Sequence, residues 1–286
     1  MNRHWEAFFG RGLVRTTEDF GFQGELPSHP ELLDWLALEF IKQGWSQKRM
    51  HKLLVMSATY QQASRVTPEL LERDPQNLLL ARGPRFRVEA ELVRDAALAA
   101  SGLFSEKLGG PSVYPPQPPG VTTEGAYGEL KWTVSEGPDR YRRGLYTFAK
   151  RTAPYAMTAA FDGPSGEACL ARRDRSNTPL QALTLLNDEV FLECAQALGK
   201  AALCQAGSEA AVADTLFRRC LTRPPSMGER EKLVRFYKTQ LARFASGELQ
   251  AAEITGSAEG KLLNEQAAWT AVARVLLNLD ESISKN

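Results

Sequence analysis

Helix-start signals recur along the chain and constrain its fold more than any other feature. Residues 226–229 and 28–31 both have the Ser-x-x-Glu pattern of a capping box. Thr178, Pro179 and Gln181 give a third start, because threonine caps well and proline suits the first helical position. Apolar residues follow these starts at helical spacing, and no strand–helix–strand alternation is present. The sequence therefore predicts a mainly α, multi-helix globular domain of about eight helices with at most a small β-hairpin.

The limits of several other elements are also indicated. Helices are expected over residues 2–9, 88–103 and 261–279, with a flexible linker over 246–260. The short link at residues 43–45 predicts that the helices on either side form an antiparallel hairpin.

Residues 109–138 interrupt the helical pattern with six glycines and six prolines. A loop of this length is usually functional or disordered, and we expect Tyr127 and Trp132 to hold it against the arginine- and lysine-rich residues 139–151. The resulting division has an N-terminal helical half at 1–104, a Gly/Pro-rich excursion at 105–140 and a C-terminal helical half at 141–286. Both halves are expected to belong to one domain.

The composition limits the classes of partner that this chain can bind. The net charge of the 286-residue chain is +1, so no global field attracts nucleic acid, and any anion site must be local. No apolar run approaches the length of a membrane span, and the first residues lack the apolar core of a signal peptide.

Metal and cofactor signatures are missing from the sequence. The three histidines, His4, His29 and His51, include no pair four residues apart, and the four cysteines form no C-x-x-C pair. We therefore expect no metal and no cofactor, and we interpret the cysteines as small core residues. Gly10-Arg11-Gly12 is too short to predict a phosphate-binding or dinucleotide-binding loop.

Two short arginine-rich blocks are the strongest candidate for a binding site. The predicted anion-binding residues are Arg142, Arg143, Arg172, Arg173, Arg175 and Thr178. Arginine forks bind carboxylate, sulfate or phosphate, and a helix N-terminus adds backbone donors. Two alternatives stay open. The arginines could pair with Asp162, Glu167 and Asp174 and pin the long loop, or they could form a docking face for a partner.

Several longer motifs resemble one bacterial family. They include Phe9-Gly10-Arg11-Gly12, Phe161-Asp162-Gly163-Pro164 and Thr178-Pro179-Leu180-Gln181-Ala182-Leu183. Further matching segments are residues 2–5, 19–21, 27–37, 57–60, 145–146, 172–173 and 276–281. Together they resemble the planctomycete-type domain of unknown function 1553.

This resemblance implies a place in the cell but little chemistry. Members usually form the C-terminal part of large exported proteins, often with another uncharacterised domain and a cytochrome c-like domain upstream. The resemblance thus implies an extracytoplasmic or periplasmic address and upstream domains as partners. The chain itself looks like a fragment or C-terminal piece of such a protein.

Two function hypotheses follow. The first is a non-catalytic binding or assembly module of an envelope-associated bacterial protein that engages an anionic glycan, a small anion or a redox partner. The second is an enzyme that acts on an anionic carbohydrate, for example a sulfated one, in an arginine-rich pocket. In that case Asp162 or His29 would be the acid/base group.

Overall fold

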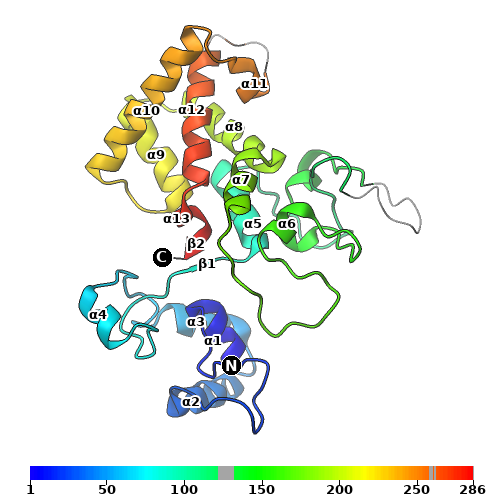
Figure 1. Ribbon diagram of the computed structural model, residues 1–286, viewed down its shortest axis with the longest axis vertical. Helices are drawn as coiled ribbons and strands as arrows, with labels where there is room; N and C mark the ends of the chain where they lie inside the picture. Colours follow the sequence, from blue (N-terminus) through cyan, green and yellow to red (C-terminus); the bar gives the residue numbers. More distant parts are fainter. Residues whose placement is uncertain (122–131, 258–259, 261, 286) are drawn as a thin grey trace. The chain divides into compact units, whose positions relative to one another are not determined.

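The computed structural model describes residues 1–121, 132–257, 260 and 262–285. Within this part the chain is 52% helical and has a single two-stranded sheet, which confirms the predicted mainly α fold (Figure 1). The chain forms two compact units. Unit 1 comprises Met1–Arg87, Cys169–Arg173 and Ser284–Asn286, and unit 2 comprises Val88–Ala168 and Asp174–Ile283. The division at residues 105 and 140 stays a prediction.

Unit 1 is a small helical cluster with a short sheet. Its elements are α1 (Asn2–Phe9), α2 (Pro30–Lys42), α3 (Gln47–Val55), α4 (Pro68–Arg73), β1 (Phe86–Arg87) and β2 (Ser284–Lys285). The two strands pair antiparallel, with Phe86 opposite Lys285. The core of unit 1 consists of Trp5, Phe9, Leu13, Leu36, Met50 and Leu54. The rings of Trp5 and Phe9 stack 4.0 Å apart, one turn from each other on α1.

Local signals set the ends of these helices. Gly10 ends α1 in the left-handed region at φ 75°, as the sequence predicts, because glycine adopts this conformation without a steric penalty. The Ser46 side chain accepts from Arg49 N and caps α3. The box predicted at residues 28–31 is wrong. α2 begins after His29, without a side-chain cap, and the Ser28 hydroxyl lies 3.0 Å from His29 Nδ1.

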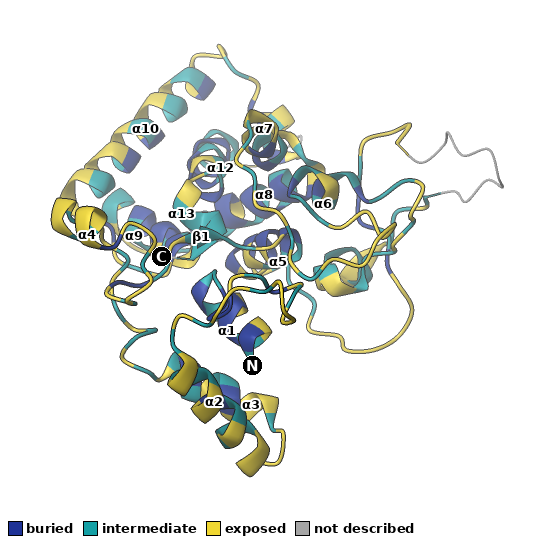
Figure 2. Cartoon of the chain, turned by 60° about the horizontal axis from the view of Figure 1, so that its bottom comes forward, coloured by how far each residue is buried: buried dark blue, intermediate teal, exposed yellow. Residues whose placement is uncertain are grey.

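Unit 2 contains most of the helix. Its elements are α5 (Ala90–Ser101), the 3₁₀ helices η1 (Gly137–Tyr141) and η2 (Gly144–Tyr146), α6 (Ala156–Ala160), α7 (Pro179–Asn187), α8 (Glu189–Leu203), α9 (Glu209–Leu221), α10 (Met227–Ala245), α11 (Ala251–Thr255), α12 (Leu263–Leu277) and α13 (Asp280–Ile283). Figure 2 shows buried residues concentrated on α5, α8 and α12.

Two close contacts define the centre of unit 2. Gly199 of α8 lies so near α12 that a Cβ atom there would meet Thr270, so only glycine permits this approach. The rings of Tyr237 on α10 and Trp269 on α12 stack 3.9 Å apart. α12 is therefore the central helix of the unit, with α8 and α10 on its sides (Figure 1).

The linker predicted at 246–260 is wrong in part, because α11 lies within it. Ala251 and Thr255 are buried, and α11 packs on α12. The burial of one face outweighs the glycine and small polar residues that suggested a linker. Residues 258 and 259 lie outside the described residues.

The described part of the excursion is held against the rest of unit 2 by aromatic residues. Trp132 Nε1 donates to the Pro115 carbonyl oxygen at 2.7 Å, and the ring of Trp132 stacks on that of Tyr155. The Tyr155 hydroxyl donates to the Pro116 carbonyl oxygen. Trp132 thus has the anchoring role expected from the sequence. Tyr127, the other expected anchor, lies outside the described residues.

Candidate functional site

The first predicted arginine block lies against the excursion. Arg142 is fully buried, and its guanidinium donates to the carbonyl oxygens of Lys107, Gly109 and Pro111. The same guanidinium lies 3.8 Å above the ring of Tyr146. A buried arginine that donates to three carbonyl groups holds the chain in place, because each of those oxygens would otherwise lose a partner.

The residues around Arg142 extend this structural role. Arg143 forms an ion pair with Asp95 at 3.9 Å. Arg140 binds Glu189 and Glu193 of α8, with N–O distances of 2.5 and 2.6 Å. The block therefore fastens the start of the excursion and the 3₁₀ helices to α5 and α8. The partners of this block are thus Asp95, Glu189, Glu193 and backbone carbonyl oxygens, and not the carboxylates that the loop-pinning alternative names.

The second predicted block is divided between the units. Arg172 and Arg173 belong to unit 1, whereas Arg175 and Thr178 belong to unit 2. Arg172 and Arg175 are exposed, and Arg173 is half-buried. Thr178 forms the predicted capping box with Gln181, whose Oε1 accepts from Thr178 N at 3.4 Å. Anion binding by these residues and by Arg142 and Arg143 stays a prediction.

Asp162 takes part in a hydrogen-bond network just before α7. Its carboxylate accepts from Ser176 N at 2.8 Å and from the Ser176 hydroxyl at 2.7 Å. Gln181 Nε2 also donates to the Ser176 hydroxyl, at 3.1 Å. These contacts connect the turn at 161–164 to the start of α7. His29, the other predicted acid/base residue, belongs to unit 1, and a catalytic role of either residue stays a prediction.

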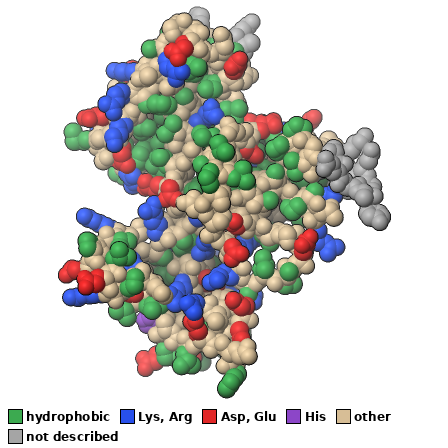
Figure 3. All heavy atoms as spheres, in the orientation of Figure 1, with side chains coloured by type: hydrophobic (Ala, Val, Ile, Leu, Met, Phe, Trp, Pro, Cys, Tyr) green, Lys and Arg blue, Asp and Glu red, His purple; other side chains and the backbone are tan. Residues whose placement is uncertain are grey.

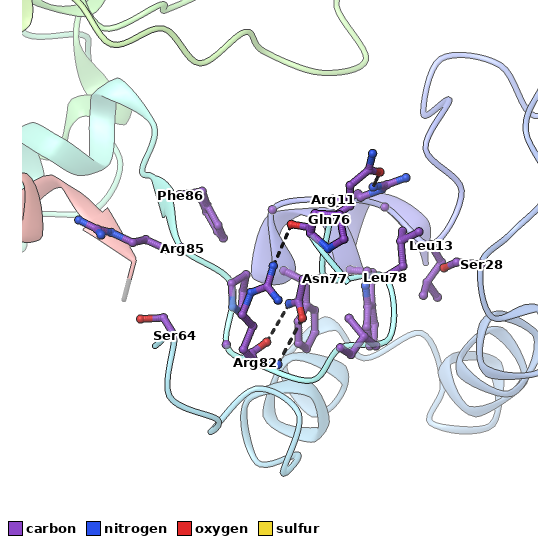
Figure 4. Close-up of a pocket in the computed structure, with 18 of the residues that line it drawn as sticks. Arg11, Leu13, Ser28, Ser64, Gln76, Asn77, Leu78, Arg82, Arg85 and Phe86 are labelled. Atoms are coloured by element: carbon purple, nitrogen blue, oxygen red, sulfur yellow. Dashed lines mark hydrogen bonds between the residues drawn. The ribbon is translucent and has the colours of Figure 1, made fainter. Parts of the chain in front are cut away.

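A pocket in unit 1 offers a better-defined site (Figure 4). It has a volume of about 320 Å³, at the lower end of ligand pockets. Its apolar wall is formed by Trp5, Phe9 and Phe86, and its polar groups include Arg11, Ser28, Ser64, Gln76, Asn77 and Arg82. We call this cavity the Arg11 pocket.

The loop after α1 shapes one side of this pocket. A Cβ atom on Gly10 would lie 2.6 Å from the Phe86 ring, and one on Gly12 would lie 2.5 Å from the Val14 carbonyl oxygen. Asn2 fixes the end of this loop, because its side-chain amide both donates to Val14 O and accepts from Val14 N, each at 2.9 Å. The two glycines thus let the backbone run close to Phe86 and place Arg11 between them.

Two guanidinium groups supply the charge of the Arg11 pocket. Arg11 Nη1 donates to Gln76 Oε1 at 2.6 Å, so its partner is a neutral amide. Arg82 is buried and donates to the carbonyl oxygens of Asp74 and Pro75, at 3.0 and 2.9 Å. Among the described residues, neither arginine forms an ion pair. Arg85 also lines the pocket, but its side chain extends away from Arg11 and Arg82 in Figure 4.

The acidic groups are arranged outside this cavity. Its lining contains no Asp, Glu or His. Asp74, close to Arg82 in sequence, turns its carboxylate to the backbone N–H groups of Leu78 and Leu79 at 2.8 Å. The Arg11 pocket is therefore a concave, positively charged site with an apolar wall.

Sequence reasoning missed this site. Gly10-Arg11-Gly12 is its local signal, but Gln76 and Arg82 lie more than sixty residues away, and only the tertiary fold places them opposite.

Other chemistries find less support. In the described part of the chain, no group of three or more His, Cys, Asp or Glu side chains is placed to hold a metal ion. His4 Nδ1 and His51 Nε2 lie 3.1 Å apart, and burial together with the His51 charge lowers the pKa of His4. None of the described helices has the length and apolar character needed to cross a bilayer.

The fold and the pocket define a mainly α-helical protein with a basic, partly apolar cavity next to its first helix. The chain belongs to the protein family of unknown function DUF1553, whose model matches residues 1–237. The whole Arg11 pocket lies within the matched residues, whereas residues 276–281 lie beyond them. No curated protein and no solved structure matches the chain significantly.

Proposed function

We propose that this chain is a non-catalytic binding module that takes up a small anionic ligand in the Arg11 pocket. One observation carries the proposal: Arg11 is held by neutral Gln76, in a cavity whose lining contains no carboxylate. An arginine oriented by an amide keeps its full charge for a ligand, whereas an ion-paired arginine is already neutralised. The wall of Trp5, Phe9 and Phe86 adds a preference for an anion with an apolar or sugar-ring face.

Binding is favoured over catalysis by the composition of the cavity. General acid–base chemistry needs a titratable group within hydrogen-bond reach of the substrate. The lining of the Arg11 pocket offers only arginines, hydroxyls and amides as polar side chains. The sulfated-carbohydrate enzyme would need Asp162 or His29, and neither lines this pocket.

The cellular setting belongs to the same proposal. The family resemblance supports an extracytoplasmic or periplasmic address and an assembly with upstream domains, one of them cytochrome c-like. An anionic envelope glycan then becomes a natural ligand class for the pocket.

Calorimetric titration of the full chain tests the binding proposal, with sulfate, phosphate, benzoate and glucuronate as probes. We expect at least one of these anions to bind, with an affinity that falls as salt is added. Arg11→Gln should abolish the binding and leave the circular dichroism spectrum unchanged. Arg218→Gln is the matched control, because Arg218 is exposed in unit 2. Equal binding by Arg11→Gln and the parent chain, or no binding of any probe, would refute the proposal.

A further inference from the structure

A second, larger cavity of unit 1 opens between α2 and α3. Its volume is about 680 Å³, and apolar residues form most of its wall. They are Leu32, Trp35 and Leu36 from α2, Leu53 and Leu54 from α3, Met56 after α3, and Trp5 at the base. We call this cavity the α2–α3 groove. It is separate from the Arg11 pocket, with which it shares only Trp5.

Large apolar side chains are exposed at the groove and elsewhere on α2. Trp35 is 51% exposed and Met56 65% exposed, although both are large apolar side chains. Leu38 and Ile41 follow Trp35 at three-residue spacing on α2, and they are exposed as well. Figure 2 shows the exposed sides of α2 and α3, and Figure 3 shows hydrophobic side chains at the surface of unit 1. Large apolar side chains that stay exposed beside a cavity are typical of an interaction site.

The α3 side of the groove has a positive charge that a partner would have to complement. Arg49 and Lys52 lie one turn apart on α3, and both line the cavity. Within the described ranges, neither side chain has an ion-pair partner, and the lining of the groove contains no Asp or Glu. The α3 side is thus basic and unneutralised, while the α2 side is apolar.

We propose that the α2–α3 groove binds an acidic amphipathic helix of a partner protein. Apolar side chains of that helix, at helical spacing, fill the cavity between Trp35 and Met56. Acidic side chains along one flank face Arg49 and Lys52. A helix laid into a groove between two helices is a recurrent mode of peptide recognition, and opposite charges on the flank fix its direction.

The shape of the groove favours a helix over a bilayer. A flat lipid surface cannot fill a concave cavity whose base is the buried residue Trp5.

Fluorescence anisotropy with labelled peptides tests this inference. The probe is a designed amphipathic helix with leucine on one face and glutamate along one flank. A second peptide has lysine in place of glutamate, and a third has two prolines that break the helix. We expect the acidic helix to bind more tightly than both others, and added salt to weaken it.

Charge reversal supplies the decisive variant. Arg49→Glu with Lys52→Glu should weaken the acidic peptide by about tenfold or more, because two attractive rim pairs become repulsive. The same double variant should bind the lysine peptide better than the parent chain does. Lys200→Glu is the control, since Lys200 is exposed on α8 of unit 2. Circular dichroism verifies that each variant is folded.

Four outcomes would overturn the proposal. They are no binding of the acidic helix at millimolar concentration, equal binding of the acidic and basic helices, and no effect of the charge reversal. The fourth is occupation of the groove by something else. That would appear as adsorption to phosphatidylserine vesicles, or as a dimer in sedimentation, either of which Trp35→Ala abolishes.

Discussion

Arg94 Nη1 donates to the backbone carbonyl oxygen of Arg142 at 2.5 Å, although forty-eight residues separate them. Arg94 Nη2 donates to the Arg140 carbonyl oxygen at 2.8 Å. The side chain of Arg94 is 1% exposed, so α5 presents a buried guanidinium to the chain that leaves the excursion. Arg142 in turn holds the start of the excursion. The two arginines therefore act in series: the Arg94 side chain binds the backbone of Arg142, and the Arg142 side chain binds the backbone of the excursion.

Removing the Arg94 side chain should destabilise unit 2. Arg94→Leu keeps apolar bulk but leaves two carbonyl groups without donors, so we expect a loss of roughly 2–5 kcal/mol in the free energy of unfolding. Arg94→Lys should lose less, because one donor and the charge remain. Chemical denaturation measures the difference. Arg218→Ala, at an exposed site, should stay within about 0.5 kcal/mol of the parent chain.

The start of α7 gives a second prediction. Thr178→Ala should cost roughly 0.5–2 kcal/mol through loss of the N-cap hydroxyl. Thr184 lies within the same helix, and its hydroxyl donates to Leu180 O four residues earlier. Thr184→Ala should therefore change stability by less than about 0.5 kcal/mol, because this local bond adds little to a helix. Equal unfolding midpoints for the two variants would mean that the cap contributes nothing.

These caps also show what the sequence could reveal. The box at Thr178, the box at Ser226 and the glycine stop at Gly10 each depend on residues within a few positions of one another, and all three are present. The box expected at residues 28–31 fails because α2 begins one residue later, so that His29 and not Ser28 is the N-cap, and no side chain caps the helix.

The role of Arg142 and the two cavities of unit 1 could not be predicted, because they depend on contacts between residues that are far apart in the sequence. Arg142 looks like a candidate anion ligand in the sequence, yet the carbonyl groups that it binds are more than thirty residues upstream. The Arg11 pocket depends on Gln76 and Arg82, for which no local pattern exists. Burial of the α2–α3 groove's base depends on Trp5 from another helix.

A partly buried carboxylate at the start of α8 predicts a pH effect on stability. Burial raises the pKa of Asp188 from 3.8 to about 6. Because the folded state holds this proton more tightly than the unfolded state, the contribution of Asp188 to stability falls as pH rises from about 4 to 6 and then levels off. The full change is of the order of 3 kcal/mol.

Asp188→Asn separates this effect from other titrations. Asparagine caps helices as well as aspartate does, so Val190 N keeps its partner. We expect the variant to lose the decline between pH 4 and 6 in urea unfolding and to be more stable than the parent chain at neutral pH. A parallel pH profile for both proteins would contradict the assignment.

The cysteines predict a reactivity order. Cys194 is fully buried, and burial raises the pKa of its thiol to about 12, whereas Cys169 and Cys204 are exposed. The expectation that all cysteines are core residues is thus wrong for the two exposed thiols. A thiol-specific label should modify Cys169 and Cys204 rapidly in the folded protein and Cys194 only after denaturation. Mass spectrometry of the labelled peptides distinguishes the sites, and rapid labelling of Cys194 would contradict the buried position.

The pairing of β1 with β2 has a consequence for how the chain could be rearranged. Phe86 and Arg87 are hydrogen-bonded to Ser284 and Lys285, and on the other side of this junction Val88 N donates to Ile283 O at 2.9 Å. The stretch from residue 88 to residue 283, nearly two hundred residues long, therefore begins and ends at adjacent points of the structure. In topological terms unit 2 is an insertion between two neighbouring strands. Residues 169–173, which lie within this stretch of sequence, belong to unit 1 and are the exception. Such a junction is a natural place to excise a module, to exchange it for another, or to join residues 88 and 283 through a short turn in a circular permutant.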